Sequence, residues 1–376
     1  MTREYGPVAL DAMGGDKAPQ AAIEGAVAAH RQGCRVLLVG DEGVLTEELR
    51  RIGEASILDD GLELVHAPEV IGMAENPAGA IRAKRGASVS VCAELVASGR
   101  CSGMVSAGST GAAVAAAVLK MGRIKGVERP GIATFIPFPN HPVVLIDSGA
   151  SPECKASHLG QFGVMGALFA RHALKIAEPR VGLLNIGEEV GKGASLHKDA
   201  HALLAARAGR LEEIDELIGS AGEESTFYRF VGNVEGYHMP MGAADVVVTD
   251  GFTGNVVLKL AEGTARAVIY ELLAVLSEGR DSRAMEELAK DFAEVKRRLN
   301  PDGAGGAYLL GVEGNCVIAH GAADARAIQY AIEFASDPEA AGLVEIMRSA
   351  FRGLKAVEEG GSRVATSAGA TAGAGA

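Results

Sequence analysis

The stretch from Val8 to Pro19 sets the strongest constraint on how this chain can fold. A short apolar run, Val8–Asp11, leads directly into the paired glycines Gly14 and Gly15, and Pro19 then stands where a helix would begin. A turn of this kind directs backbone N–H groups toward solvent and is a common way for an α/β protein to hold an anion. Glycines also allow a ligand to approach the main chain closely. The segment therefore predicts a strand, a ligand-binding turn and a helix in succession.

Four more apolar runs end in the same way, in glycines combined with Asp, Ser, Thr or Asn. Their turns are Ser106–Gly111, Asp147–Ala150, Asn185–Gly193 and Thr249–Asn255. In an open parallel sheet, ligands bind outside the carboxyl ends of the strands. Each turn taken alone is explained equally well by helix capping, because Ser, Thr, Asp and Asn are the favoured N-cap residues. Their recurrence at five strand ends favours a ligand site over capping alone.

Apolar runs alternate with helical patterns along most of the chain. We expect strands at Val8–Asp11, Arg35–Gly40, Leu62–His66, Met104–Ser106, Ile132–Ile136, Val143–Asp147, Val181–Ile186, Phe227–Val231 and Val246–Thr249. We expect helices at Pro19–His30, Pro77–Ser98, Thr110–Leu119, Ser157–Ala173 and Ala194–Arg207. Most of the strand candidates are continuously apolar, as strands buried on both faces are. The alternation predicts an α/β fold with a doubly wound, mostly parallel sheet.

The predicted domain organisation is simple. Residues 1–357 are expected to form a single large α/β domain, and a chain of this length can bury a sizeable core. Two apolar helical faces joined by the polar turn Gly279–Ser282 predict a helical hairpin at about 255–299. The faces are Val268, Ile269, Leu272, Leu273 and Leu276, then Met285, Leu288, Phe292, Val295 and Leu299. The Gly/Ala-rich tail, 358–376, has nothing to pack and is expected to be disordered.

Charge and cysteine usage exclude several functional classes. With 36 basic and 48 acidic residues, the net charge of −12 argues against a nucleic-acid partner. The cysteines Cys34, Cys92, Cys101, Cys154 and Cys316 are odd in number and scattered, as in reduced cytosolic proteins. No secretory leader and no apolar run of bilayer length is recognisable. We therefore expect a cytoplasmic protein.

The turn from Gly187 to Gly193 is the clearest phosphate-type loop. Its Gly-x-x-x-Gly-Lys-Gly pattern is one residue shorter than a Walker A loop, and Gly193 replaces the hydroxyl that would hold magnesium. Binding of ATP or GTP is therefore disfavoured, but contact between Lys192 and a small phosphate is not. The absence of G-x-G-x-x-G weakens a dinucleotide interpretation. Because G-x-S-x-G is absent and no cysteine lies in a recognisable catalytic signature, we expect no covalent nucleophile. His197 and His201 fit a surface helix better than a zinc site, so we expect no metal and no cofactor.

Six segments follow one another in an order that is typical of one family: Asp11–Asp16, Ser106–Ala112, Asn185–Gly187, Gly232–Gly236, Thr249–Asn255 and His320-Gly321. Together they resemble the bacterial phosphate acyltransferases of phospholipid synthesis, over roughly Val8 to Phe351. The resemblance implies a Rossmann-like fold related to phosphotransacetylases and decarboxylating dehydrogenases. It also implies transfer of a long-chain acyl group from acyl carrier protein to inorganic phosphate. The acyl phosphate product would then be used by a membrane glycerol 3-phosphate acyltransferase.

The chain departs from the family pattern at three places. Ser109 and Ser151 stand where the family usually has Asn, and Ala322-Ala323 replaces Ser-Ser after His320-Gly321. Ser109 keeps a hydrogen-bonding group, so that change is mild. The alanine pair removes two hydroxyls and puts a direct ligand role for that loop in doubt.

Site residues follow from the motifs together with the reaction. Lys192 is expected to offset the charge of the phosphate and the developing oxyanion, with glycine-turn N–H groups as further donors. Asn255 is expected to hold the phosphate or the thioester carbonyl, and Asp250 to orient Lys192 or a loop, as Asp16 would. The expected substrate-binding residues are Asp11, Gly14, Gly15, Asp16, Ser106, Gly108, Ser109, Thr110, Gly111, Asn185, Gly187, Gly251, Thr253, Gly254 and His320.

The resemblance also implies a homodimer with its interface at the helical hairpin, and a peripheral membrane contact there. An acidic carrier protein would need a basic patch on this acidic chain. One candidate patch is Arg280, Arg283, Lys290, Lys296, Arg297 and Arg298, and the other is Arg123, Lys125 and Arg129. Three alternatives stay open: an acyl-coenzyme A phosphotransacylase, a decarboxylating dehydrogenase using Asp147, Asp245 and Asp250 for Mg²⁺, and a non-catalytic carrier-protein scaffold.

Overall fold

The computed structural model describes residues 6–139, 141–208, 228–277, 288–293, 295, 306–337 and 342–355. Several predictions fall outside these residues. They are the disordered tail, the turn Gly279–Ser282, the hairpin residues Met285 and Leu299, and the basic residues Arg280, Arg283, Lys296, Arg297 and Arg298.

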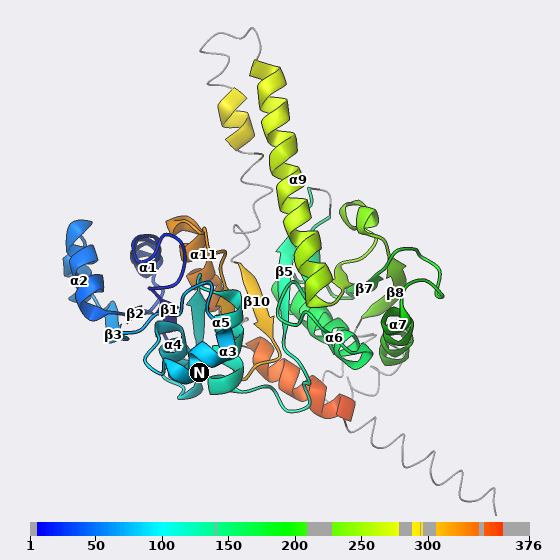
Figure 1. The fold of residues 1–376 in the computed structure, drawn as a ribbon, viewed down its shortest axis with the longest axis horizontal. Helices are drawn as coiled ribbons and strands as arrows, with labels where there is room; N and C mark the ends of the chain where they lie inside the picture. The colour runs from blue at the N-terminus through cyan, green and yellow to red at the C-terminus, as the bar shows by residue number, and fades with distance from the viewer. Residues whose placement is uncertain are drawn as a thin grey trace, which may run out of the picture.

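Strands and helices alternate along the first two thirds of the described chain (Figure 1). The strands are β1 Val8–Asp11, β2 Val36–Gly40, β3 Glu63–His66, β4 Gly103–Ser106, β5 Gly131–Ile136, β6 Val143–Ile146, β7 Arg180–Leu184, β8 Arg229–Val234, β9 Val246–Val248, β10 Ala307–Leu310 and β11 Asn315–Ile318. The principal helices are α1 Gln20–Arg31, α2 Glu42–Arg51, α3 Pro77–Ala83, α4 Ser88–Ala97, α5 Thr110–Ala116, α6 Ala156–Ala173, α7 Ser195–Ala208, α9 Gly251–Ser277 and α11 Ala325–Ala335. Residues 342–355 are also helical.

All the strands belong to one sheet, in the order β3-β2-β1-β4-β11-β10-β5-β6-β9-β7-β8. The pairs on either side of the centre are parallel, which confirms the predicted mostly parallel α/β sheet. The pairs β11–β10, β10–β5 and β5–β6 are antiparallel. As a result, β1 to β4 and β11 run one way and β6 to β9 run the opposite way. Each half of the sheet therefore has its own set of carboxyl ends.

Helices cover both faces of the first half of the sheet, because alternate side chains of each strand point to opposite sides. Val8 and Leu10 of β1 pack in one buried cluster with residues of α1, α2 and α11. Ala9, between them, packs in a second cluster with residues of α3, α4 and α5. This two-sided burial explains the continuously apolar strands.

The second half of the sheet is built similarly, and it is where α9 begins. Residues of α6 and α7 pack against one face of β6, β7 and β9, and Val257 and Leu258 of α9 pack against the other. Beyond this contact α9 projects away from the sheet (Figure 1). Among the residues described, no helix is both long enough and apolar enough to cross a membrane.

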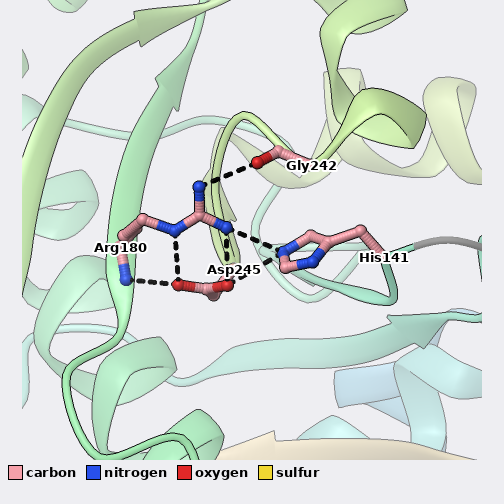
Figure 2. A network of polar contacts seen from close by, with 4 residues as sticks. All are labelled: His141, Arg180, Gly242 and Asp245. Atoms are coloured by element: carbon pink, nitrogen blue, oxygen red, sulfur yellow. Dashed lines mark hydrogen bonds and ion pairs between the residues drawn. The ribbon is translucent and has the colours of Figure 1, made fainter.

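A network of hydrogen bonds connects residues at the start of β7 and β9, in the second half of the sheet (Figure 2). The backbone N–H and the guanidinium of Arg180 donate to Asp245, at 2.7 Å and 3.0–3.1 Å. Arg180 also donates to the carbonyl of Gly242 at 2.8 Å, and His141 Nε2 lies 2.9 Å from the Asp245 carboxylate. The network therefore ties the turn between β5 and β6 to both strands.

One helix prediction is wrong in detail. The expected helix Pro77–Ser98 is two helices, α3 and α4, separated at residues 84–87. There Ala87 forms a bridge with Glu69, and the backbone N–H of Gly86 donates to the Glu69 carboxylate at 2.9 Å. Pairing with this neighbouring segment replaces the next helical turn. Other boundaries moved by one to three residues. The apolar run Cys316–Ala319, expected to place His320 at a strand end, corresponds to β11, whereas strand β10 and helices α2 and α11 were not predicted.

Candidate active site

A cavity of about 110 Å³ lies where the two halves of the sheet meet. The first half contributes Thr110, after β4, and His320, after β11. The second half contributes Ser148, after β6, and Asn255 of α9. Carboxyl ends of strands that run in opposite directions therefore share one cavity, and three of these four residues were predicted from the sequence.

The turns after β1 and β4 are joined behind this cavity by Asp11. The hydroxyl of Ser106 donates to Asp11 Oδ2 at 2.7 Å, and the backbone N–H of Gly108 donates to the Ser106 hydroxyl at 3.2 Å. Burial raises the pKa of Asp11 above its ordinary value, although hydrogen bonds from Ser88 and Ser106 oppose this effect. A Cβ on Gly14 would lie 2.5 Å from Asp11 Oδ2. Asp11 and Ser106 thus hold the two glycine turns together.

The turn after β1 is also joined to the loop after β11. The backbone N–H of Asp16 donates to the carbonyl of Gly321 at 2.8 Å. Gly15 has a φ of +110°, a conformation that favours glycine. The predicted residues Asp11, Gly14, Gly15, Asp16, Ser106, Gly108 and His320 are therefore grouped on connected loops.

On the opposite side, Asp147 organises the turn after β6. Its buried carboxylate accepts N–H groups of Ile132, Gly149, Ala150 and Ser151 at 2.7–3.0 Å. Burial is the largest influence on its pKa and raises it, while these backbone bonds act to lower it. The next residue, Ser148, shares a 2.6 Å hydrogen bond with Thr134 of β5. The buried carboxylate thereby fixes a pair of hydroxyls at the cavity wall.

Asn255 lies one turn inside α9 and faces the turn that Asp147 holds. A Cβ on Gly149, whose φ is +148°, would lie 3.0 Å from Asn255 Nδ2. The absence of a side chain at Gly149 leaves room for the Asn255 amide beside the cavity. An amide in this position can donate to a phosphate or to a carbonyl oxygen.

Other predicted site residues have structural roles. Asp250 accepts from the backbone N–H of Thr253 at 2.9 Å and from its hydroxyl at 2.7 Å, as a helix cap. The Ser109 hydroxyl caps α5 by accepting from the N–H of Ala112. A Cβ on Gly111 would meet Pro77 at 2.6 Å, and one on Gly251 or Gly254 would clash with Asp147. Capping and close packing explain these residues without a ligand.

The loop after β7 stands apart from the cavity. Lys192 is half exposed, and its ammonium lies 3.8 Å from Glu189 of the same loop. Asn185 is buried, and its amide donates to the backbone carbonyl of Lys192 at 3.2 Å. A Cβ on Gly187 would lie 2.9 Å from Lys192 Cγ. Neither Lys192, Asn185 nor Gly187 lines the cavity. The contacts of Lys192 are thus with residues of its own loop, and Lys192 does not share the cavity with Asn255.

A different lysine, which was not predicted from the sequence, faces the cavity. Lys259 Nζ lies 3.0 Å from His320 Nε2 and 3.1 Å from the carboxylate of Glu262. Lys259 and Glu262 line the cavity with Asn255. The signal was present in the sequence, because Asn255 and Lys259 are four residues apart on a helix and therefore share a face.

The thiols of the chain are poor candidates for a nucleophile. All five cysteines are free, and three of them are buried. Burial raises the pKa of Cys154, beside the Asp147 turn, to about 12, and Asp147 adds to this effect. The protonated thiol is therefore the dominant form at neutral pH. Within the described part of the chain, no three His, Cys, Asp or Glu side chains are grouped where they could hold a metal ion.

Comparison with known proteins identifies full-length relatives. A family model described as "Fatty acid synthesis protein" matches residues 7–346. The "Phosphate acyltransferase" of Elusimicrobium minutum is 42% identical over 354 residues, which cover 94% of this chain and 98% of that protein. A protein of the same name from Thermus thermophilus is 43% identical over 348 residues, covering 92% of this chain and 99% of that protein.

Solved structures with a similar fold are much more distant in sequence. A phosphotransacetylase from Streptococcus pyogenes superposes with a TM-score of 0.55 at 14% identity, over 91% of this chain and 95% of that one. The EutD phosphotransacetylase of Staphylococcus aureus gives a TM-score of 0.52 at 14% identity, over 93% and 94%. These two superpositions confirm the expected Rossmann-like class of fold.

Proposed function

The chain belongs to the phosphate acyltransferase family, and we propose that it transfers a long-chain fatty acyl group from acyl carrier protein to inorganic phosphate. The observation that carries this proposal is the identity of about 42% that extends over nearly the whole of both chains. The chain is an acyltransferase of fatty acid and phospholipid synthesis. The acyl phosphate would serve a membrane glycerol 3-phosphate acyltransferase.

The cavity has the groups that such a transfer needs. Phosphate at neutral pH is largely a dianion and is already nucleophilic, so positioning and control of charge matter more than a strong base. Hydroxyls of Thr110 and Ser148 and the amide of Asn255 line the space, with Lys259 as a cation. A donor aimed at the developing oxyanion is typically worth about 3–4 kcal/mol of transition-state stabilisation. We assign that role to Asn255.

The other assigned residues do not line the cavity and act from outside it. In the glycine turns after β1 and β4, the N–H groups of Gly14 and Gly108 are held by Asp11 and by the Ser106 hydroxyl, so phosphate would bind neighbouring backbone N–H groups of these turns. Lys192 would approach bound phosphate from the loop after β7, and its present partner Glu189 is weakly held at 3.8 Å. Asp250 would act by fixing the start of α9 and therefore the position of Asn255.

The proposed partners follow from the surface of α9 and from charge. Large apolar residues of α9 are exposed at helical spacing: Val256, Leu260, Val268, Leu272 and Val275. A second copy of the chain would cover this stripe and form a homodimer, because exposed apolar stripes on one helix face are typical of interfaces. A peripheral membrane contact would use the same projecting helix. The exposed residues Arg123, Lys125 and Arg129 would offer positive charge to the carrier protein.

A phosphate-dependence assay tests the proposal. Purified protein is mixed with palmitoyl-carrier protein, and release of the free carrier thiol is followed with and without inorganic phosphate. Thiol release that requires phosphate, with acyl phosphate as the product, is expected. Release from acyl-coenzyme A alone would assign the chain to the coenzyme A-dependent phosphotransacylases, and no release from either donor would contradict transfer to phosphate.

A further inference from the structure

The proposed reaction has to move one proton. When HPO₄²⁻ attacks the thioester, a C–O bond forms to the acyl carbon and the C–S bond breaks. The products are an acyl phosphate dianion and a thiol, so the proton that began on the phosphate oxygen ends on sulfur. General acid–base groups that carry such a proton typically contribute about 10²–10⁴-fold in rate. None of the roles assigned above supplies this transfer.

The titratable groups of the cavity meet at the base of α9. Lys259, Glu262 and His320 are the titratable residues among the described residues that line it. Lys259 Nζ lies 3.0 Å from His320 Nε2 and 3.1 Å from Glu262. The other ring nitrogen, His320 Nδ1, accepts the backbone N–H of Ala322 at 3.1 Å. Asp16 lies next to this loop, because its backbone N–H donates to the carbonyl of Gly321.

These contacts place a proton donor at the wall of the cavity. An ammonium has three N–H donors and no acceptor, and the contacts of Lys259 Nζ with Glu262 and His320 account for at most two of them. The remaining N–H is available to a group bound in the cavity that Lys259 lines. Lys259 can therefore hold a proton and give it to that group.

We infer that Lys259 and His320 form the proton-transfer pair of the acyl transfer, an assignment that rests on the proposed function. The ammonium of Lys259 gives a proton to the sulfur of the leaving thiolate as the C–S bond breaks. Lys259 then takes the O–H proton of the phosphate that has formed the C–O bond, so the net transfer is from the phosphate oxygen to sulfur. Glu262 and His320 hold the amine in place between the two transfers.

Arginine in place of lysine tests the assignment, because a guanidinium keeps the positive charge but does not give up a proton. Wild-type protein, Lys259→Arg and Lys259→Met are compared with palmitoyl-carrier protein and with an S-phenyl thioester of palmitate. With the carrier thioester, both variants are expected to lose about 10²-fold in kcat, while KM for phosphate changes by less than about threefold in Lys259→Arg, which keeps the charge. With the phenyl thioester, whose thiolate leaves without a proton, the deficit is expected to fall to about tenfold or less.

Lys198→Arg, at an exposed lysine of α7, is the matched control and should behave as wild type. Lys259→Arg with near wild-type kcat would overturn the inference and leave Lys259 as a binding charge. Equal deficits with both thioesters would overturn it too. If the Lys259 variants fail to fold, His320→Gln, on an exposed loop, decides by the same comparison. No phosphate-dependent release by the wild-type chain would instead contradict the proposed function itself.

Discussion

Four polar contacts converge on Asp245, two from the guanidinium of Arg180, one from its backbone and one from His141 (Figure 2). Burial by itself raises the pKa of Asp245, but the hydrogen bonds from Arg180 outweigh this and hold the pKa below its ordinary value. A carboxylate with a lowered pKa in the folded state stabilises the fold above its unfolded pKa. Asp245 therefore connects the stability of the second half of the sheet to pH.

Asp245→Asn is expected to lower the free energy of unfolding by about 2–4 kcal/mol at pH 7, because it leaves Arg180 partly unpaired. The contribution of Asp245 is fully present above pH 4 or so, the unfolded pKa, and is lost as pH falls through the folded pKa. Urea unfolding at pH 7 and at several values below pH 4 measures both effects. The variant and the wild type should converge in acid, and a constant difference at every pH would contradict the assignment.

Gly14 is a position where an added methyl group should push apart the glycine turns after β1 and β4, which are proposed to bind phosphate. A Cβ there would lie 2.5 Å from Asp11 Oδ2 and 2.8 Å from the backbone nitrogen of Gly108. Gly14→Ala is expected to lower kcat/KM for phosphate about 10²-fold, since a displacement of about 1 Å at a site can cost that much. Steady-state kinetics with varied phosphate provides the measurement.

The control for Gly14 is Gly342→Ala, because a Cβ at that helical glycine meets no atom within 4 Å. It should leave kcat/KM unchanged and increase stability slightly, as expected for alanine in a helix. Similar kinetics in the two variants would mean that the close approach of Gly14 to Gly108 does not position the phosphate.

The positions of the polar turns were predictable from the sequence, because each turn is defined by residues that are neighbours in the chain. Turns such as Gly14-Gly15 and Thr249–Asn255 could be located because glycines and small polar residues follow an apolar run. The partner of each side chain could not be predicted. Ser109 and Asp250 have the composition of ligands and are used as helix caps, whereas Lys259 meets His320 across 61 residues of chain.

At the scale of elements, the sequence predicted most strands to within one residue at either end. The strand β1 was predicted to the residue, and β2, β5 and β9 to within one residue at either end. The short strand β10 was missed because Ala307–Leu310 is stabilised by antiparallel partners, β5 and β11, that are distant in the chain. The break between α3 and α4 has the same origin, since it depends on pairing with Glu69.

The helix α9 carries the prediction of a dimer. The double variant Val268→Glu/Leu272→Glu places two carboxylates in the exposed stripe, where burial against a partner would leave them desolvated. Light scattering is expected to show a dimer for the wild type and a species near the chain mass of 38.5 kDa for the variant. Arg266→Glu, on another face of the same helix, should stay dimeric. A wild-type monomer at micromolar concentration would contradict the dimer.

At the scale of the whole molecule, the reversal of strand direction was not predicted. Local sequence patterns predict the fold class, but the direction of each strand depends on the antiparallel pairs β10–β5 and β5–β6. The first pair joins segments that are distant in the chain, and the pattern of the second pair is compatible with either a parallel or an antiparallel arrangement. The consequence for function is large. The five strand-end turns do not share one edge, and the cavity forms only where the ends of the two halves meet at Thr110, Ser148, Asn255 and His320.

Because the proposed phosphate site is shared by both halves of the sheet, bound phosphate should stabilise the molecule as a whole. At a phosphate concentration about 100 times the dissociation constant, the expected gain is about 2.7 kcal/mol, or a rise in Tm of about 3–5 °C. Thermal unfolding is followed in phosphate and in sodium chloride of equal ionic strength, which separates binding from salt effects. Gly14→Ala should lose most of the phosphate-specific shift because its turns are separated, while Gly342→Ala should keep it. An equal rise in chloride, or a full shift in Gly14→Ala, would mean that phosphate does not bind across the two halves.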